Sequence, residues 1–188
     1  MSSLILAIVI GGAFGFVLDR IGATNPDYII GMLRLSRLHL MKTILLGIGV
    51  ASVLLFAGLL AGLVPAGHLS VKAAYVGVIV GGGLLGAGFA IAGYCPGTGL
   101  AAAATGRKDG WFFVLGGLVG AGLYMASYSW VKSTGILADI AGGKSTLGAI
   151  AGTKYPALIA GIPGELAGVV VGVVLIVIAC ALPARMRG

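Results

Sequence analysis

The sequence has few charged residues, and this scarcity excludes most classes of soluble protein. Charged residues make up 9% of the chain and hydrophobic residues 59%, whereas a soluble domain carries about 25% charged residues. A chain of this composition cannot cover an apolar core with a polar surface. The sequence therefore predicts an all-α integral membrane protein.

Cysteine and histidine are scarce too, with two residues of each. Cys95 and Cys180 are far apart, so the chain has neither a Cys-x-x-Cys redox pair nor a zinc cluster. His39 and His68 lack the spacing of metal ligands and are interpreted as residues of the membrane interface. We expect no metal and no cofactor.

No ATP-binding motif is present either. The segment AGGKST at 141–146 has the look of a phosphate-binding loop, but Ala138 stands where that loop requires a glycine, five positions before Gly143. No strand is predicted before it. We interpret the segment as a chance match, so any transport would be driven by a gradient or by downstream consumption.

The uncharged runs predict about five membrane-spanning helices. Four runs have the length of one span, about 20 residues, but the third, 73–106, is much longer. At about 1.5 Å per residue, one helix of that length would exceed the hydrocarbon core of about 30 Å. Gly93, Pro96, Gly97 and Gly99 are the available breakers, so we expect a broken helix or re-entrant half-helix near 93–105. The expectation is a single membrane domain, 1–188, with spans at about 2–18, 43–65, 73–92 plus the half-helix 97–105, 110–131 and 166–183, and interfacial loops at 19–42 and 132–165.

Lysine and arginine are distributed unevenly between the two sides of these spans. Most of the twelve basic residues follow the first, third and last runs, among them Arg20, Arg107 and Arg185. Because basic residues favour the cytoplasmic side, we expect a multi-pass protein of the inner (plasma) membrane with its N-terminus outside and its C-terminus in the cytoplasm. The net charge of +7 either reflects this anchoring or attracts an anionic solute.

Glycine is abundant, and part of its pattern occurs twice. The chain has 35 glycines, and small residues let membrane helices pack closely. In addition, the segments GAFGFVLDRIGATNP (12–26) and GLLGAGFAIAGYCP (83–96) share glycine spacings of three and then seven residues, and both end at a proline. We interpret them as an internal repeat. Helices that break at corresponding positions of two repeats are typical of a transport site.

Cys95 lies at the break in the third run. Since proline prefers the first turn of a helix, Pro96 would begin the half-helix and Cys95 would be at or near its N-cap. The backbone amides of Gly97, Thr98 and Gly99 would then point toward the thiol, with the hydroxyl of Thr98 as a further donor. A helix start attracts anions. The pattern fits either an anion site or a buried structural cysteine in a kinked helix.

Two other parts of the chain carry weaker signals. Cys180 has no glycine, proline or polar neighbour and is interpreted as a lipid-facing or packing residue. The segment 132–165 is apolar but interrupted by lysines and prolines, so we expect one or two short interfacial helices on the outer side. Glu165 is expected near the start of the last span, where the helix dipole favours it.

The segment GFAIAGYCPGTGLAAAATGRKDGWFFVLGGLVGAGLY, preceded by GGAFGFVLDRIGATNPDYIIGML, resembles the YeeE/YedE family of sulfur-compound transporters. The resemblance covers roughly residues 8–128, and the Cys-Pro-Gly-Thr stretch is its specific part. It implies a helical membrane protein in which loops dip to the bilayer centre from both sides and cysteines pass thiosulfate along through weak S–H contacts. By position, Cys95 matches the central cysteine of the family, and its motif partners are Gly93, Pro96, Gly97 and Thr98.

The chain departs from the family in length and in cysteine content. Full-length members are longer and have a functional cysteine near the N-terminus, where this chain reads GATNPD. Thr24 and Asn25 can donate hydrogen bonds there but cannot relay through sulfur. The chain thus resembles a half-size member, whose complete pathway would need a homodimer or a second, cysteine-bearing subunit.

Three functions are compatible with these features. The first is a transporter or permease subunit for thiosulfate or a similar sulfur-containing anion, which would not be an enzyme. The second is a membrane-embedded sulfur-transfer or thiol-redox protein, for which a general base or second thiol near Cys95 would be expected. The third is a structural partner of a second transporter half. No nucleic-acid partner is expected.

Overall fold

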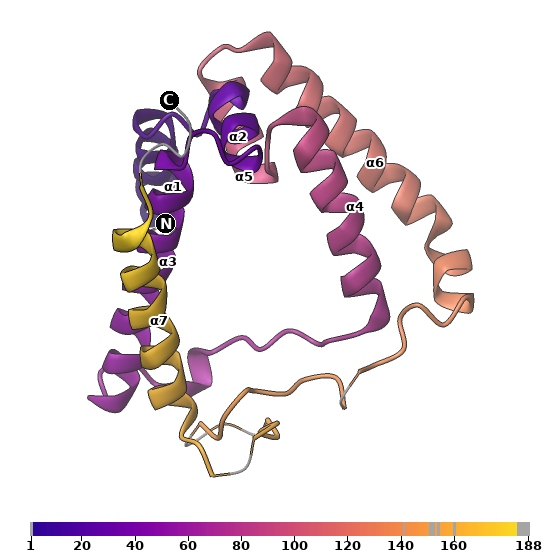
Figure 1. The fold of residues 1–188 in the computed structure, drawn as a ribbon. Coiled ribbons are helices and arrows are strands. Elements are labelled where there is room, and N and C mark those ends of the chain that lie inside the picture. The colour runs from indigo at the N-terminus through magenta and orange to yellow at the C-terminus, as the bar shows by residue number, and fades with distance from the viewer. Residues whose placement is uncertain (1, 141, 151–152, 154, 160, 184–188) are drawn as a thin grey trace. The chain divides into compact units, whose positions relative to one another are not determined.

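The computed structural model describes residues 2–140, 142–150, 153, 155–159 and 161–183. These residues form helices and no named strand, which confirms the all-α prediction (Figure 1). In chain order the elements are α1 (Ser2–Arg20), α2 (Pro26–Leu33), α3 (His39–Leu60), the 3-10 helix η1 (Ala66–His68), α4 (Val76–Ala92), α5 (Pro96–Ala104), α6 (Lys108–Ser133) and α7 (Gly164–Ala181).

Five helical segments are long and apolar enough to cross a membrane, as the sequence predicts. They are Ser3–Arg20, His39–Leu60, Val76–Ala104, Lys108–Ser133 and Gly164–Ala181. Their apolar side chains point outward: Ile91 of α4 is 84% exposed and Met125 of α6 is 77% exposed. Helices that are apolar on their outer surface are typical of segments that lipid surrounds. The chain is a multi-pass membrane protein.

The second span differs from its predicted bounds of 43–65. α3 begins at His39, and Lys42 in its first turns donates from Nζ to the carbonyl oxygen of Leu182 at 3.4 Å. A long basic side chain at a helix end can reach such a polar partner without ending the helix. α3 ends at Leu60 because Gly62 has a φ of +70° and the amide of Leu63 donates to the carbonyl of Gly58 at 2.9 Å, a pattern typical of helix C-termini.

The segment 19–42, expected to be an interfacial loop, contains the short helix α2. Asn25 caps it with an extended backbone, and Pro26 is its first residue. Proline fits this position because the first amide of a helix has no intrahelical partner. α2 has eight residues, so it cannot cross a bilayer, and its role is local.

The segment 132–165, in contrast, has less helix than the sequence predicts. Between α6 and α7, the described residues form turns, bends and isolated bridges, so the expected short interfacial helices are absent from them. Gly135, Gly142 and Gly143 have positive φ values, which interrupt helical geometry. Glu165 lies in the first turn of α7, as predicted.

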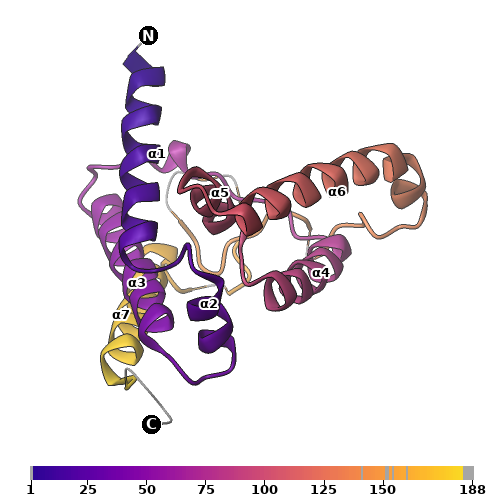
Figure 2. The ribbon, with the colours of Figure 1, turned by 90° about the horizontal axis from the view of Figure 1, so that it is seen from above.

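The described chain forms two compact units. Unit 1 contains the residues up to Leu40 together with Gly82–Val131, and unit 2 contains Met41–Gly81 and Lys132–Pro183. In unit 1, α5 packs against α1 (Figure 2). The buried apolar side chains of this unit lie in or beside α2 and α5 and at the start of α3, and they are Ala23, Ile29, Met32, Leu38, Leu40, Tyr94, Ala102 and Ala103.

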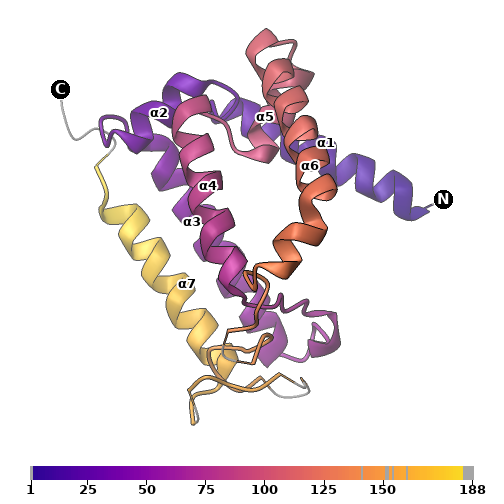
Figure 3. The ribbon, with the colours of Figure 1, turned by 90° about the vertical axis from the view of Figure 1, so that its right-hand side faces the viewer.

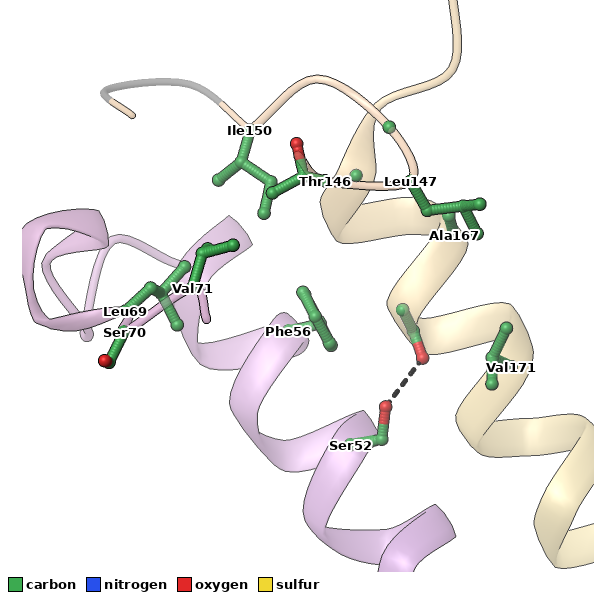
Figure 4. Close-up of a pocket in the computed structure, with 13 residues that line it drawn as sticks. Ser52, Phe56, Leu69, Ser70, Val71, Thr146, Leu147, Ile150, Ala167 and Val171 are labelled. Carbon is green, nitrogen blue, oxygen red and sulfur yellow. Dashed lines mark hydrogen bonds between the residues drawn. The ribbon is translucent and has the colours of Figure 1, made fainter. Parts of the chain in front are cut away.

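Unit 2 is built on the pair α3 and α7. A Cβ on Gly49 of α3 would lie 2.7 Å from the carbonyl oxygen of Gly172 on α7, so the two backbones are in direct contact, as small residues permit in membrane helices. The hydroxyl of Ser52 donates to the carbonyl oxygen of Gly168 at 2.9 Å. Beside this bond lies an apolar pocket of about 350 Å³, with Phe56 among its lining residues (Figure 4).

Candidate functional site

The helix break between α4 and α5 is made by Gly93. Its φ is +69°, and its amide closes the last turn of α4 on the carbonyl of Phe89 at 2.9 Å. A Cβ at this position would lie 2.7 Å from Cβ of Pro26, so glycine is required both for the turn and for the close approach. The chain turns back after α4 before α5 begins (Figure 3). The contact also places the break before α5 against the start of α2.

Cys95 is the N-cap of α5, as the sequence predicts. Its backbone is extended, with φ −87° and ψ 165°, and Pro96 is the first residue of the helix. The Sγ atom accepts a hydrogen bond from the amide of Thr98 at 3.4 Å, while the amide of Cys95 donates to the Thr98 hydroxyl at 2.9 Å. This reciprocal arrangement is a capping box with sulfur in place of the usual oxygen.

The structure corrects the expectation that three amides point freely toward the thiol. The amide of Gly99 donates to the carbonyl of Cys95 at 2.9 Å and so belongs to the first helical turn. The amide of Thr98 is bonded to Sγ. Among the described residues, only the amide of Gly97 in this turn has no hydrogen-bond partner. The Thr98 hydroxyl lies 3.3 Å from Sγ and 3.2 Å from the Cys95 carbonyl oxygen, and it can donate to either.

A pocket of about 280 Å³ adjoins Cys95. Its other lining residues are Gly82, Leu85, Gly86 and Phe89 of α4. Gly82 and Gly86 are one helical turn apart and lie on the same face, so their missing side chains leave space beside the cysteine. The walls are apolar, and the partly buried Cys95 supplies the only polar side chain of the lining.

The first break, before α2, repeats this backbone pattern. Gly22 has a φ of +80°, and the extended cap residue Asn25 precedes Pro26. The Oδ1 atom of Asn25 accepts the amide of Asp27 at 3.1 Å. The hydroxyl of Thr24 donates to Asp19 at 2.7 Å, and Thr24 is 6% exposed. The two breaks thus share a left-handed glycine, an extended cap and a first-turn proline, as the internal repeat predicts.

The two breaks meet at Gly93 and Tyr94, not through the side chains of Thr24, Asn25 or Cys95. Pro26 contacts Gly93, and the hydroxyl of Tyr94 lies 3.3 Å from the carbonyl oxygen of Thr24. The side chains of Thr24 and Asn25 bond within their own turn. Thr24 and Asn25 therefore shape the first break, and Cys95 contributes the only thiol of the two.

Sequence reasoning missed a polar cluster beside the cysteine. Tyr94 is 2% exposed, and its hydroxyl lies 2.8 Å from Oδ2 of Asp109 and 3.1 Å from Nε of Arg107. Arg107 and Asp109 form an ion pair at 2.9 Å. The bond to Asp109 raises the pKa of Arg107 above its usual value, so this guanidinium stays charged. No spacing rule links a tyrosine with residues at the start of a later helix, so no sequence signal could have found this cluster.

The other residues considered in the sequence analysis do not belong to this site. Cys180 is exposed on α7. The described part of the phosphate-loop look-alike, 142–146, leads into further turns and bridges instead of the helix that such a loop requires. His39 begins α3, and His68 ends η1. In the described residues, no three His, Cys, Asp or Glu side chains are grouped so that they could hold a metal ion.

Taken together, the fold and the site define a class: a multi-pass helical membrane protein with repeated helix breaks, an architecture typical of transporters. The model of the sulphur transport family matches residues 28–186. The chain belongs to this family, the YeeE/YedE family whose resemblance the sequence shows. Neither the curated proteins nor the solved structures contain a match. The matched segment includes α5 and Cys95 but begins after Thr24 and Asn25.

Proposed function

We propose that the chain is a transporter or permease subunit for thiosulfate or a similar sulfur-containing anion, and that Cys95 contacts the anion in transit. The observation that carries this proposal is the position of Cys95. It caps α5 at a helix break and lines a pocket of about 280 Å³. Irregular backbone inside a membrane protein is tolerated where it lines a cavity, and a helix N-terminus favours an anion.

The donors at this site would hold an anion weakly. The pocket walls are apolar, so an anion that enters loses water and depends on the few donors present. Of these, only the S–H of Cys95 belongs to the lining of the pocket, while the amide of Gly97 and the hydroxyl of Thr98 lie in the adjoining first turn of α5. A thiol is a weak hydrogen-bond donor. Weak contacts suit conduction, because the anion must leave as well as enter.

The N-cap residue at the first break suggests that one chain does not form the complete pathway. Asn25 occupies the position there that Cys95 occupies before α5, so one chain carries a thiol at one break only. We propose that a homodimer or a second, cysteine-bearing subunit completes the pathway. The protein would lie in the inner membrane with its N-terminus outside, and the anion would move down a gradient or toward its consumption, without enzymatic chemistry and without a cofactor.

Uptake of radiolabelled thiosulfate by cells without other uptake routes tests the proposal. The chain is expressed alone and with a candidate partner half, as wild type, Cys95→Ala, Cys95→Ser and Cys180→Ala. Cys95→Ser keeps an N-cap acceptor and removes only the sulfur. We expect uptake to be lost in both Cys95 variants and kept in Cys180→Ala, whose position is on α7.

Two outcomes would contradict the proposal. Unchanged uptake in Cys95→Ala would show that the thiol is not part of the pathway. A stable gain in mass on Cys95 after exposure to thiosulfate would instead indicate covalent sulfur transfer. Amounts of inserted protein are compared in every case, so that lost uptake is not confused with failed insertion.

A further inference from the structure

Tyr94 precedes the capping cysteine and contacts residues of two other chain segments, the first helix break and the start of α6. Its side chain is 2% exposed. We propose that Tyr94 is a positioning residue, which holds the Cys95 turn between the first helix break and the start of α6 and thereby fixes the direction of the thiol. The transport consequence of this inference rests on the proposed function, whereas its structural consequence does not.

The first contact is with the break before α2. The Tyr94 hydroxyl lies 3.3 Å from the carbonyl oxygen of Thr24. Next to it along the chain, Gly93 packs on Pro26, whose Cβ would be 2.7 Å from a Cβ at Gly93. Two successive residues before Cys95 are therefore held against the first break.

The second contact is with the segment that begins α6. Nε of Arg107 donates to the Tyr94 oxygen at 3.1 Å, so the hydroxyl hydrogen is available to an acceptor. The Oδ2 atom of Asp109 lies at 2.8 Å and is the nearer acceptor, while the Thr24 carbonyl is farther away. A hydrogen bond to a charged partner is stronger than one between neutral groups. The ion pair of Arg107 and Asp109 therefore fixes the orientation of the Tyr94 hydroxyl.

The third contact is apolar and involves α5 as well. The rings of Tyr94 and Phe113 lie with centroids 5.6 Å apart and planes at 57°, a favourable tilted arrangement. The same Phe113 ring fills the space beside Gly99, where any Cβ would overlap it. Phe113 of α6 therefore packs on both α5 and Tyr94.

These contacts act on Cys95 through the backbone. The Tyr94 hydroxyl bonds away from the Cys95 pocket, whose lining does not include Tyr94. Loss of the hydroxyl would release the turn from Thr24, Arg107 and Asp109 but would leave the thiol, its cap and the ring packing in place. A change in the behaviour of Cys95 would then report positioning and not lost chemistry.

The test measures the reactivity of Cys95 in the full chain, in membranes, with Cys180→Ala as the background so that Cys95 is the sole cysteine. Tyr94→Phe is compared with Tyr128→Phe, a matched control in which an exposed tyrosine of α6 loses its hydroxyl. We expect N-ethylmaleimide to alkylate Cys95 about fivefold faster in Tyr94→Phe, the size of effect that one lost hydrogen bond produces, and at the parent rate in Tyr128→Phe. Thiosulfate uptake should fall by a similar factor in Tyr94→Phe and stay at the parent level in Tyr128→Phe.

A second variant identifies the partner. Asp109→Asn keeps the shape of the side chain and removes the charge that pairs with Arg107. If Tyr94 acts through this pair, Asp109→Asn also speeds alkylation, and the double variant exceeds neither single variant by much, because coupled residues are not additive. Asp109→Asn carries the same test if Tyr94→Phe fails to insert.

The inference would be overturned if Tyr94→Phe and Asp109→Asn both showed the same alkylation rate and the same uptake as Tyr128→Phe. The outcome is distinguishable from a failure of the proposed function. If the parent chain does not take up thiosulfate, the transport proposal fails, but the alkylation rates still decide whether Tyr94 positions the thiol.

Discussion

The helix breaks before α2 and before α5 share a backbone design and differ in the chemistry of one residue. Each has a glycine with positive φ, Gly22 at +80° and Gly93 at +69°, followed by an extended cap and a proline in the first turn. The cap is Asn25 in one and Cys95 in the other. Glycine and proline set the shape of a break, so a repeat can keep its shape while a single cap position changes its function.

Gly93→Ala compared with Gly22→Ala should show the largest difference between the breaks. Both substitutions place a side chain in the left-handed region, which costs about 1–2 kcal/mol. At Gly93 the new Cβ also lies 2.7 Å from Pro26, whereas at Gly22 its nearest atom is 3.5 Å away on the Tyr28 ring. We expect a loss of about 3 kcal/mol in the unfolding free energy for Gly93→Ala and about 1 kcal/mol for Gly22→Ala.

SDS-induced unfolding of the purified protein measures this difference. Gly97→Ala, at a helical position with no atom within 4 Å of its Cβ, is the control and should unfold at nearly the parent SDS concentration. Equal losses at Gly22 and Gly93 would mean that the Pro26 contact contributes nothing.

Cys95→Asn makes the two caps identical and tests whether their difference is functional. Asparagine is among the best N-cap residues, so α5 should remain capped while the S–H donor disappears. We expect initial rates of thiosulfate uptake to fall about tenfold or more, which corresponds to about 1.4 kcal/mol in the barrier. Asn25→Cys is the matched change at the first break and should not lower uptake. Uptake that survives Cys95→Asn would show that any capped break suffices.

The position and form of the second break could be predicted from the sequence, because glycine and proline act locally. Pro96 begins α5 and Cys95 caps it, as expected from the preference of proline for the first turn. The same reasoning applied to Pro26 indicates α2, which the charged residues around it concealed. Local signals failed in 132–165, where apolar composition suggested helices and glycines with positive φ prevent them.

The cluster around Tyr94 could not be predicted, because it depends on tertiary placement. Arg107 and Asp109 are close to each other in sequence, but only the turn into α6 brings them to the Tyr94 hydroxyl. The Thr98 amide donates to sulfur as expected, whereas the reciprocal bond from the Cys95 amide to the Thr98 hydroxyl was not predicted. Sequence patterns locate a helix start, whereas the direction of each polar group near it depends on side-chain geometry.

Thr98→Val compared with Thr24→Val separates the two threonines next to the breaks. Thr98 is 7% exposed and its hydroxyl accepts the amide of Cys95 at 2.9 Å, so valine leaves this part-buried amide without its partner. Thr24 donates to the exposed Asp19, which water can solvate instead. We expect losses in unfolding free energy of about 2 kcal/mol for Thr98→Val and below about 1 kcal/mol for Thr24→Val. The thermal unfolding midpoint in detergent measures both, and rescue by Thr98→Ser would confirm the role of the hydroxyl. A larger loss at Thr24 would contradict this ranking.

The smallest effects concern the strength of the caps themselves. Asn25→Ala removes a good oxygen acceptor and should cost about 1 kcal/mol. Cys95→Ala should cost less, about 0.5 kcal/mol, because sulfur is a weak acceptor and its bond to the Thr98 amide is 3.4 Å long. Cys95→Ser, with a preferred N-cap oxygen, should stabilise the protein by a few tenths of a kcal/mol. Unfolding midpoints and uptake, measured in parallel, would then show that Cys95→Ser is slightly more stable than the parent and inactive in uptake. That combination indicates that the thiol is kept for function at the expense of the cap, whereas a destabilised Cys95→Ser would indicate that sulfur at this cap is structural.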